Sequence, residues 1–393
     1  MKGRTLLMIP GPIEFEPEVL AALGAPTTSH VAPEFIELFA QALARMREVW
    51  RCPSGQPFVV AGSGTLAMEM AAANLVEPGD RVLVVSTGYF SERFADILAR
   101  YGPEVTKLVA PLGETIDPSQ VESTLRRGGF KLMTITHVDT STAVRVDPQP
   151  LTALALEHGV LTVLDGVCSL AAEELQQEDW GIDVALTASQ KAIGVPPGLA
   201  LLVASGRALQ AWRNRRTPVG NYYADWGNWL PIMEAYEGRK ASYFATPAVN
   251  LVAALHVSLG QILAEGMEAR VGRHQRLGKA CRAAVRALGM KQVPTAEEHA
   301  AATLTAPYFP SGVAGQELLA RVKAAGAIVA GGLHPEIKTS YFRIGHMGAT
   351  TSGDLLATIG ALEQGLRACG HTFTPGVGLA AAQQVLVEEE PSH

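Results

Sequence analysis

The chain has 393 residues, of which 48% are hydrophobic and 18% charged, and its formal net charge is −6. This composition predicts two or three structural units with large buried cores and argues against a disordered chain. The sequence holds no dense block of Lys and Arg, which argues against nucleic acid as a main partner.

The cysteines and the apolar runs indicate the cellular compartment in which we expect the protein. The four cysteines are scattered without a CxxC motif, so we expect free thiols in a reducing compartment and neither a disulfide framework nor a metal site. The apolar stretch near the N-terminus is too short for a signal-peptide core, and no uncharged apolar run approaches the length of a membrane span. We therefore expect a cytoplasmic protein without a membrane partner. The cysteines are Cys52, Cys168, Cys281 and Cys369.

The first half of the chain alternates short β-rich runs with helical segments. Because the runs are apolar throughout and are separated by amphipathic stretches, such as residues 91–101 and 150–158, they indicate a mainly parallel sheet with helices on both faces. The predicted strands cover residues 58–61, 82–85, 131–136, 160–164 and 199–203.

The second half has a different pattern. Residues 206–245 are rich in Trp, Tyr and Arg without clear periodicity, as in an active-site or interface region, and residues 247–289 have helical periodicity that includes a long connecting helix. Strands at 301–305, 327–330 and 341–344 and a helix at 352–368 predict a smaller α/β unit. We divide the chain into an N-terminal arm (1–20), a large domain (21–250), a connecting helix with a small domain (251–380) and a flexible tail (381–393).

One lysine stands among small, uncharged residues in the segment from Thr187 to Gly198. The apolar run 160–164 ends on Asp165, 26 residues before Lys191. Pyridoxal phosphate (PLP) needs a lysine for its Schiff base and an anion opposite its pyridine nitrogen, so the pair suits PLP chemistry. Taken singly, the two residues also fit a surface lysine in a loop and an aspartate that caps a helix.

Two further strand ends offer groups that suit a planar, phosphorylated ligand. Ser63, Gly64 and Thr65 follow the first strand and open a helix, where glycine and unpaired N–H groups favour an anion. Such a turn is also common as plain structure, and it is neither a Walker loop nor a dinucleotide fingerprint. Tyr89 and Phe90 follow the next strand, and one of them could stack on a ring or pack in the core.

Two later segments add polar groups. Residues 136–143 are rich in hydroxyls and could bond the cofactor ring or the substrate carboxylate, or form a polar turn; His137 in this segment stays unassigned. Arg343 interrupts an otherwise apolar strand, where a cation is costly unless it is paired. Its planar fork matches a carboxylate, which is either a substrate α-carboxylate or a structural salt-bridge partner.

In this order, the motifs resemble class V PLP-dependent aminotransferases of fold type I, and most of all the alanine–glyoxylate and serine–pyruvate aminotransferases. The resemblance covers nearly the whole chain, and its most specific element is Ser189-Gln190-Lys191-Ala192 followed by Pro196-Pro197-Gly198. It implies a large domain with a seven-stranded, mainly parallel sheet between helices, plus a smaller C-terminal α/β domain.

The resemblance also implies roles for individual residues. Lys191 and Asp165 would be catalytic, Arg343 would bind the substrate carboxylate, and no metal is involved. Tyr243 and Thr246 would reach the phosphate in the neighbouring subunit of a homodimer. Ala143 and Thr140 depart from the family's usual glycine and serine. The cofactor-binding set is Ser63, Gly64, Thr65, Phe90, Thr140, Asp165, Ser169, Gln190, Lys191, Tyr243 and Thr246.

The activity that the resemblance implies is ping-pong transamination, with alanine or serine as donor and glyoxylate or pyruvate as acceptor. Serine–glyoxylate and ureidoglycine–glyoxylate activities remain open alternatives. A PLP lyase such as a cysteine desulfurase would need a mobile cysteine before the arginine, and residues 333–342 contain none. A regulator or binding module that keeps the PLP fold is a further alternative, which the intact Lys, Asp and Arg set disfavours.

Overall fold

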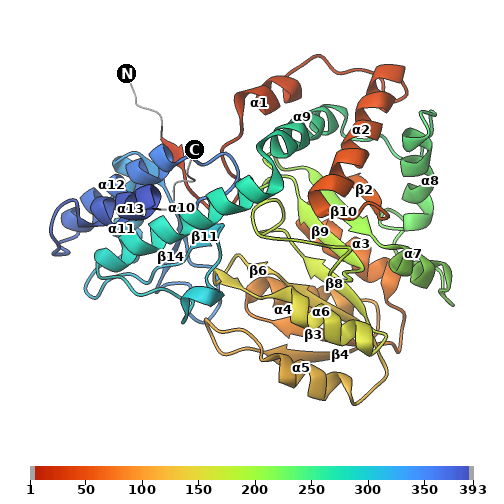
Figure 1. Ribbon diagram of the computed structural model, residues 1–393, viewed down its shortest axis with the longest axis horizontal. Coiled ribbons are helices and arrows are strands. Elements are labelled where there is room, and N and C mark those ends of the chain that lie inside the picture. Colours follow the sequence, from red (N-terminus) through yellow and green to blue (C-terminus); the bar gives the residue numbers. More distant parts are fainter. Residues whose placement is uncertain (1–4, 389–393) are drawn as a thin grey trace.

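A seven-stranded sheet forms the centre of the larger part of the protein (Figure 1). The computed structural model describes residues 5–388. The strand order is β2-β10-β9-β8-β5-β3-β4, and only β10 runs antiparallel to its neighbours. The bounds are β2 Gln56–Ala61, β3 Arg81–Ser86, β4 Glu104–Val109, β5 Phe130–Thr136, β8 Leu161–Asp165, β9 Val184–Ala188 and β10 Leu199–Ala204.

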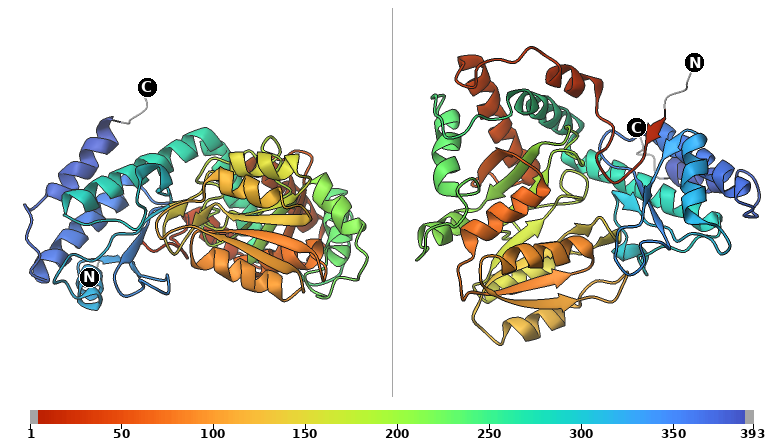
Figure 2. Two further views of the ribbon diagram at one scale, coloured as in Figure 1. Left: turned by 90° about the horizontal axis from the view of Figure 1, so that it is seen from below. Right: turned by 180° about the vertical axis from the view of Figure 1, so that it is seen from behind.

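Helices cover both faces of this sheet (Figure 2). The mainly parallel sheet between helices that the sequence predicts is therefore confirmed, as fold type I. The helices of this part are α1 Pro17–Leu23, α2 Pro33–Trp50, α3 Gly64–Leu75, α4 Tyr89–Ala99, α5 Pro118–Leu125, α6 Pro148–Glu157, α7 Gly206–Arg213, α8 Trp226–Glu237 and α9 Val249–Glu265.

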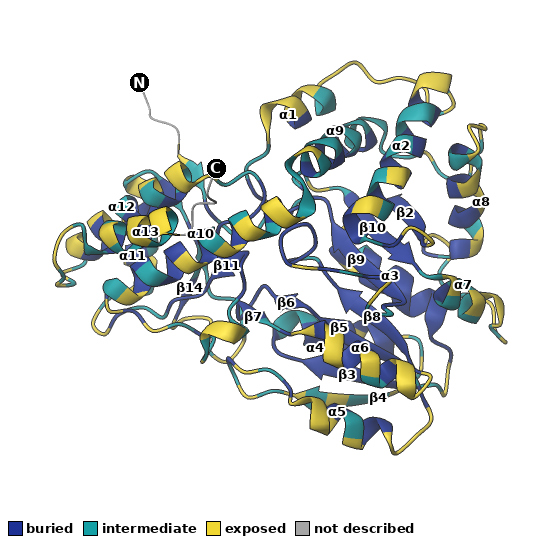
Figure 3. Ribbon diagram, in the orientation of Figure 1, coloured by how far each residue is buried: buried dark blue, intermediate teal, exposed yellow. Residues whose placement is uncertain are grey.

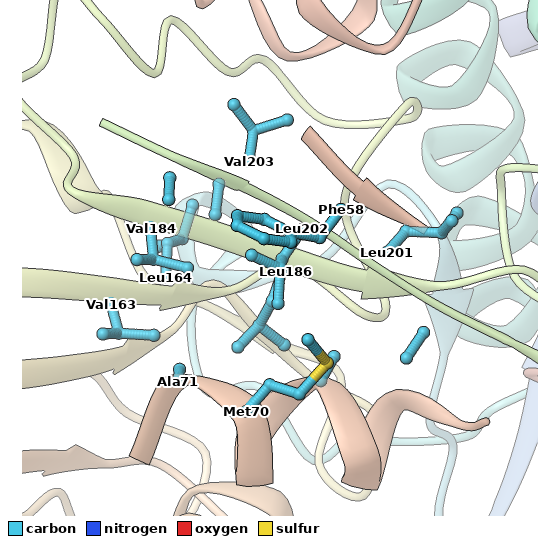
Figure 4. Packing of buried hydrophobic residues seen from close by; sticks show 14 of the residues in the cluster. Phe58, Met70, Ala71, Val163, Leu164, Val184, Leu186, Leu201, Leu202 and Val203 are labelled. Atoms are coloured by element: carbon cyan, nitrogen blue, oxygen red, sulfur yellow. The ribbon is translucent and has the colours of Figure 1, made fainter. Parts of the chain in front are cut away.

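The central strands are apolar because both of their faces are buried (Figure 3). Every residue of β8, β9 and β10 is buried, and side chains of α3 such as Met70 pack beside sheet residues such as Leu186 (Figure 4). Burying one such side chain contributes about 1.5–3 kcal/mol. The edge strand β4 is the exception, with exposed and half-buried residues.

A smaller unit follows the bend between α9 and α10. Its core is separate from that of the large sheet, and the chain's beginning joins it, since β1 pairs in parallel with β12. A three-stranded antiparallel sheet in the order β11-β14-β13 faces the large domain. The elements are β1 Leu6–Leu7, α10 Met267–Ala287, η1 Glu297–His299, β11 Leu304–Thr305, α11 Gly315–Ala324, β12 Ala327–Ile328, β13 Ala330–Gly331, β14 Phe342–Gly345, α12 Ser352–Ala368 and α13 Val377–Glu388. A two-stranded ribbon, β6 Val138–Asp139 with β7 Val144–Arg145, lies beside it.

The structure differs from the sequence prediction at two places. The helical stretch 247–289 is two helices, α9 and α10, which meet at 86° around Gly266. The predicted flexible tail is corrected over residues 381–388, which belong to α13 and pack on α10 through buried residues such as Ala382; residues 389–393 lie outside the described chain. Within residues 5–388, no single helix is long and apolar enough to span a membrane, and only the bent pair α9–α10 reaches that length and composition together.

The topology brings the predicted site segments to one edge of the sheet. Parallel strands β3, β5, β8 and β9 all end there, and Asp165 lies beside Thr136 in the register of β8 and β5. The reversed strand β10 begins at this edge, where Leu199 pairs with Ala61 at the end of β2. Ligands of open α/β sheets bind outside the carboxyl ends of the strands.

Candidate active site

Lys191 lies buried in the loop after β9, with 8% of its surface exposed. Its Nζ donates to the carbonyl of Pro10, and Gly11 packs on its side chain so closely that a Cβ there would lie 2.6 Å from Cδ. Burial lowers the pKa of the Lys191 amine, and the positive charge of Arg343 acts in the same direction. A lowered pKa leaves more of the amine neutral, which is the form that attacks a carbonyl.

Asp165 ends β8 with 2% of its surface exposed. Its carboxylate accepts one hydrogen bond, from Val167 N at 2.9 Å, and has no ion pair within residues 5–388. Burial raises the pKa of Asp165 to about 7, and the negative charge of Asp139 adds to the effect. A cationic partner, such as a protonated ring nitrogen, would stabilise the ionised form of this buried carboxyl group.

Three buried polar atoms at this edge have no hydrogen-bond partner among residues 5–388: Thr87 Oγ1, Ser169 Oγ and Gln190 Oε1. Leaving a buried polar atom unsatisfied costs about 1–3 kcal/mol, so such atoms are rare unless a ligand or water bonds to them. Thr87 follows β3, Ser169 follows β8 and Gln190 follows β9. Together with the unpaired carboxylate of Asp165, they fit a polar ring compound bound beside Lys191.

The turn before α3 has free donors for an anion. Ser63 is the N-cap of α3, and its side chain does not cap the helix, so neither the hydroxyl nor the first N–H groups are used in that way. A Cβ on Gly64 would lie 2.8 Å from Val167, two residues after Asp165. This close approach requires glycine and places the turn against the Asp165 loop. Thr65 is exposed beside it.

Phe90 is held in place by Asp139, a buried residue to which the sequence assigns no role. Asp139 Oδ2 accepts from Phe90 N at 2.9 Å and Ser91 N at 3.2 Å, and so satisfies the N-terminus of α4. The Phe90 and Tyr89 rings lie 80° apart, and Arg93 lies over both, 5.0 and 4.9 Å from their centroids. Asp139 therefore sets the direction of the ring that the family resemblance assigns to stacking.

The loop 139–143 reaches the small domain through backbone atoms. Thr140 is buried, and its carbonyl accepts from Arg343 Nη1 at 3.1 Å. Ala143, where the family commonly has glycine, has a φ of 61°, in the left-handed region that glycine tolerates best. His137 is buried, which lowers its pKa to about 3, so its ring stays neutral.

Arg343 has no acidic partner within residues 5–388. Its Nε donates to Gly331 O at 3.0 Å and its Nη1 to Thr140 O, and burial lowers the pKa of the guanidinium. The structural salt bridge that the sequence left open is thus not formed in this part of the chain. A half-buried guanidinium bonded only to carbonyls is suited to receive a carboxylate.

Tyr243 and Thr246 lie on the surface of the single chain, Tyr243 with 64% of its area exposed. The Tyr243 ring contacts His30, with centroids 5.4 Å apart. Within residues 5–388, no hydrogen bond joins either residue to the site residues. Their predicted contact with a neighbouring subunit's phosphate stays a prediction.

The sequence profile of the family described as "Aminotransferase class-V" matches residues 18–349. The chain belongs to this family. It is 40% identical to alanine–glyoxylate aminotransferase 1 of Saccharomyces cerevisiae, over 89% of this chain and 93% of the yeast protein. It is 32% identical to a serine–glyoxylate aminotransferase of Arabidopsis thaliana, over 99% and 97%. The crystal structure of pyridoxamine–pyruvate aminotransferase from Mesorhizobium loti superposes with a TM-score of 0.93 at 28% identity, over 99% and 98%.

Membership confirms the family resemblance, the fold, the enzyme class and the cofactor. The protein is a PLP-dependent aminotransferase, which acts between an amino acid and a 2-oxo acid. The residues present fit PLP: a buried lysine with a lowered pKa, a buried carboxylate without a cation, and three unpartnered polar atoms around them.

Proposed function

We propose that the enzyme transfers the amino group of alanine to glyoxylate, with serine and pyruvate as further substrates. The observation that carries the substrate class is Arg343, a half-buried cation whose bonds within residues 5–388 go only to carbonyls, and which is close enough to Lys191 to affect its pKa. An α-amino or α-keto acid brings the carboxylate that this guanidinium lacks. Alanine and glyoxylate are suggested by the name of the yeast relative.

The roles of the chain's own residues follow from their surroundings. Bound PLP supplies an electron sink for the pair of electrons left when the substrate Cα loses its proton. Lys191 would hold the cofactor covalently and, when released, its amine would take and return that proton. Asp165 would keep the ring nitrogen protonated, and Phe90, directed by Asp139, would stack on the ring.

The phosphate would be held by the turn before α3 and by Gln190. Ser63, Gly64 and Thr65 offer the free helix N-terminus. Gln190 would donate from its side-chain amide N–H₂, because phosphate oxygens accept hydrogen bonds and the amide oxygen cannot donate. Ser169, unpartnered within residues 5–388, lies where it could bond a polar group of the ring. Thr140 contributes its carbonyl to the position of Arg343.

A small, uncharged donor side chain suits the rest of the site. Arg93, whose positive charge acts to lower the pKa of Asp165, is engaged with Tyr89 Oη at 3.0 Å and with two aromatic rings. It is therefore poorly placed to bind a second substrate carboxylate. This supports alanine or serine over an acidic donor.

We infer further that the active form is a cytoplasmic homodimer with shared active sites. Tyr222 and Tyr243 expose 78% and 64% of their surface, and large aromatics of this kind are enriched at interfaces. Tyr243 and Thr246 would then reach the phosphate of the other subunit. The four cysteines are free, as expected in a reducing compartment. Light scattering after size exclusion should give a dimer, and a fully active monomer would exclude shared sites.

The experiment that tests the substrate class combines Arg343 variants with a donor panel. For Arg343→Ala, kcat/KM should fall by about 30-fold or more for every α-amino acid, because truncating one partner of a desolvated charge pair costs about 2–5 kcal/mol. PLP should still bind, since the arginine contacts substrate. Arg343→Lys should restore little, because an ammonium lacks the bidentate fork.

The panel compares alanine, serine, aspartate and ureidoglycine against glyoxylate and pyruvate in steady state. Highest kcat/KM for alanine with glyoxylate is the expected result. If kcat/KM is highest for serine or ureidoglycine, that amino acid is the preferred donor and alanine is not. Unchanged KM values in Arg343→Ala would mean that another residue holds the carboxylate.

A further inference from the structure

One helix contacts the loop of Lys191 and the two segments that follow Asp165 and Arg343. α10 starts at the bend after α9 and runs into the small domain (Figure 1). Arg270 lies in its first turn, with only 6% of its surface exposed. Its Nε donates to Ala171 O and its Nη2 to Ala192 O, both at 2.8 Å.

These two carbonyls belong to the loops of Lys191 and Asp165. Ala192 directly follows Lys191, and Ala171 lies in the turn that follows Asp165. Ala171 has a φ of 67°, a left-handed conformation that costs a non-glycine residue roughly 1–2 kcal/mol. Such a conformation persists where the surroundings hold it, and the bond to Arg270 is one such restraint.

The third guanidinium nitrogen fixes the arginine itself. Arg270 Nη1 pairs with Glu265 Oε2 at 2.7 Å, and Glu265 also pairs with Arg273 Nε at 2.6 Å. All three nitrogens of Arg270 are therefore bonded: one to a carboxylate and two to the loops. A lysine could keep the charge in this place but could not bond three separate acceptors in one plane.

His274, one turn further along α10, ties in the loop after Arg343. Its Nε2 accepts from Gly348 N at 2.9 Å, so the ring proton is on Nδ1, which bonds Arg270 O at 2.7 Å. Burial lowers the pKa of His274 well below its usual range, and the charges of Arg270 and Arg273 add to this effect. The ring thus stays neutral and keeps Nε2 as an acceptor.

We propose that Arg270 is a positioning residue that fixes the Lys191 and Asp165 loops relative to each other. The lysine amine and the carboxylate must meet the same cofactor ring from different strand ends, and one guanidinium bonded to both loops sets that spacing. This role rests on the proposed functions of Lys191 and Asp165. It extends them to a residue whose three guanidinium nitrogens are all bonded within the protein.

The test compares Arg270→Lys and Arg270→Gln with Arg273→Gln. Arg273 is the matched control, because it shares Glu265 and bonds the Thr350 carbonyl but has no hydrogen bond to either loop. Hydrogen exchange is measured on the full chain, with and without PLP, in peptides covering residues 165–173 and 189–196. PLP affinity and the pH titration of the bound cofactor's visible band are measured on the same samples.

For both Arg270 variants, we expect exchange in both peptides to be about tenfold faster or more, because each loop loses a bond to a charged donor. PLP should bind about tenfold more weakly and the midpoint of the visible titration should shift. Arg273→Gln should stay within about twofold of wild type in all three measurements.

Arg270→Lys keeps a cation beside Glu265, so it provides the result if Arg270→Gln does not fold. Equal exchange and PLP affinity in Arg270→Lys and Arg273→Gln would overturn the proposal. Wild-type enzyme with PLP attached at a lysine other than Lys191 would instead refute the proposed function, whatever the exchange data show.

Discussion

Two buried aspartates, Asp165 and Asp183, lie at opposite ends of neighbouring strands in the central sheet and have very different surroundings. Asp183, just before β9, accepts from Arg207 Nε at 2.8 Å, Ser205 Oγ at 3.0 Å and Thr162 N at 2.8 Å. Asp165, at the end of the parallel neighbour β8, accepts only from Val167 N within the part of the chain that the structure describes. Both residues are at most 2% exposed.

This difference distinguishes a structural aspartate, Asp183, from a functional one, Asp165, within the same sheet. The carboxylate of Asp183 has a cation and polar neighbours, so its charge is balanced within the fold. The carboxylate of Asp165 is left without a cation, and its raised pKa is the electrostatic consequence. Polar groups without partners lie at the carboxyl ends of the parallel strands, where a bound cation would balance the charge of Asp165.

The largest effect is expected for a lysine at the carboxyl ends of the strands, compared with one at their amino ends. Lys191→Ala should lower turnover by about 10⁴-fold or more, since it removes the covalent attachment and the proton carrier together. Borohydride treatment of the wild-type holoenzyme should label the peptide that contains Lys191. The control is Lys131→Ala, at the amino edge of β5, where the lysine pairs with Glu77 and Asp80.

The Lys131 variant should keep the label, the yellow colour and near wild-type turnover per folded molecule. Labelling at Lys240 or Lys338 in the wild type would show that the cofactor lysine has been misassigned.

The aspartates themselves give the second test. Asp165→Asn should lower kcat by about 10²–10³-fold, because a neutral amide cannot hold the ring-nitrogen proton and a lost buried charge partner costs roughly 3–5 kcal/mol. Its melting temperature should not fall. Asp183→Asn should show the reverse. It should reduce the free energy of unfolding, because Arg207 loses its carboxylate partner, and kcat should stay near the wild-type value in the protein that remains folded. Equal effects on both quantities in the two variants would remove the distinction.

A third test uses pH, in the enzyme freed of PLP. The pKa of Asp165 is about 7 in the folded chain and about 3.9 in an unfolded one. Between these values only the folded state binds the proton, so the free energy of unfolding should fall as pH rises from about 4 to about 7. Between pH 5 and 7 the contribution is on the order of 2–3 kcal/mol.

Chemical denaturation of the wild type and of Asp165→Asn at both pH values isolates this contribution as a difference. The variant should lack it, and bound PLP should reduce it by supplying the cation. A wild-type slope that the asparagine variant retains would assign the titration to another group.

The sequence predicts elements well where burial makes the pattern uniform. The runs that became β3, β5, β8 and β10 are apolar along their length, and both faces are covered. β4 was not predicted, because it is an edge strand with polar residues such as Glu104 and Lys107. β9 was not predicted because only two of its five residues, Val184 and Leu186, are large and apolar.

Site residues divide in a similar way. Lys191, Asp165 and Arg343 could be singled out because a charge inside an apolar segment is visible in the sequence. Arg270 could not, since its two partners near the site are backbone carbonyls, and Ala171 lies 99 residues away. The Pro10 carbonyl that receives the Lys191 amine lies 181 residues away. Contacts with distant backbone atoms leave no pattern that a single sequence can show.

The smallest effect is expected at Ala143, in the active-site loop. Ala143→Gly removes a buried methyl group, worth about 0.8 kcal/mol, and frees the unfolded chain, which costs about 0.4–1 kcal/mol. It also relieves the left-handed backbone at φ 61°, a strain of roughly 1–2 kcal/mol. These contributions nearly cancel, so the free energy of unfolding should change by about 0.5 kcal/mol or less.

Ala155→Gly is the matched control, because Ala155 is equally buried but lies within helix α6. It loses the methyl group and helix propensity with no strain to relieve, and should cost about 1–2 kcal/mol. Denaturant titration of the two variants side by side compares them directly. If Ala143→Gly is destabilised as much as Ala155→Gly, the left-handed conformation of Ala143 stores no backbone strain in the active-site loop.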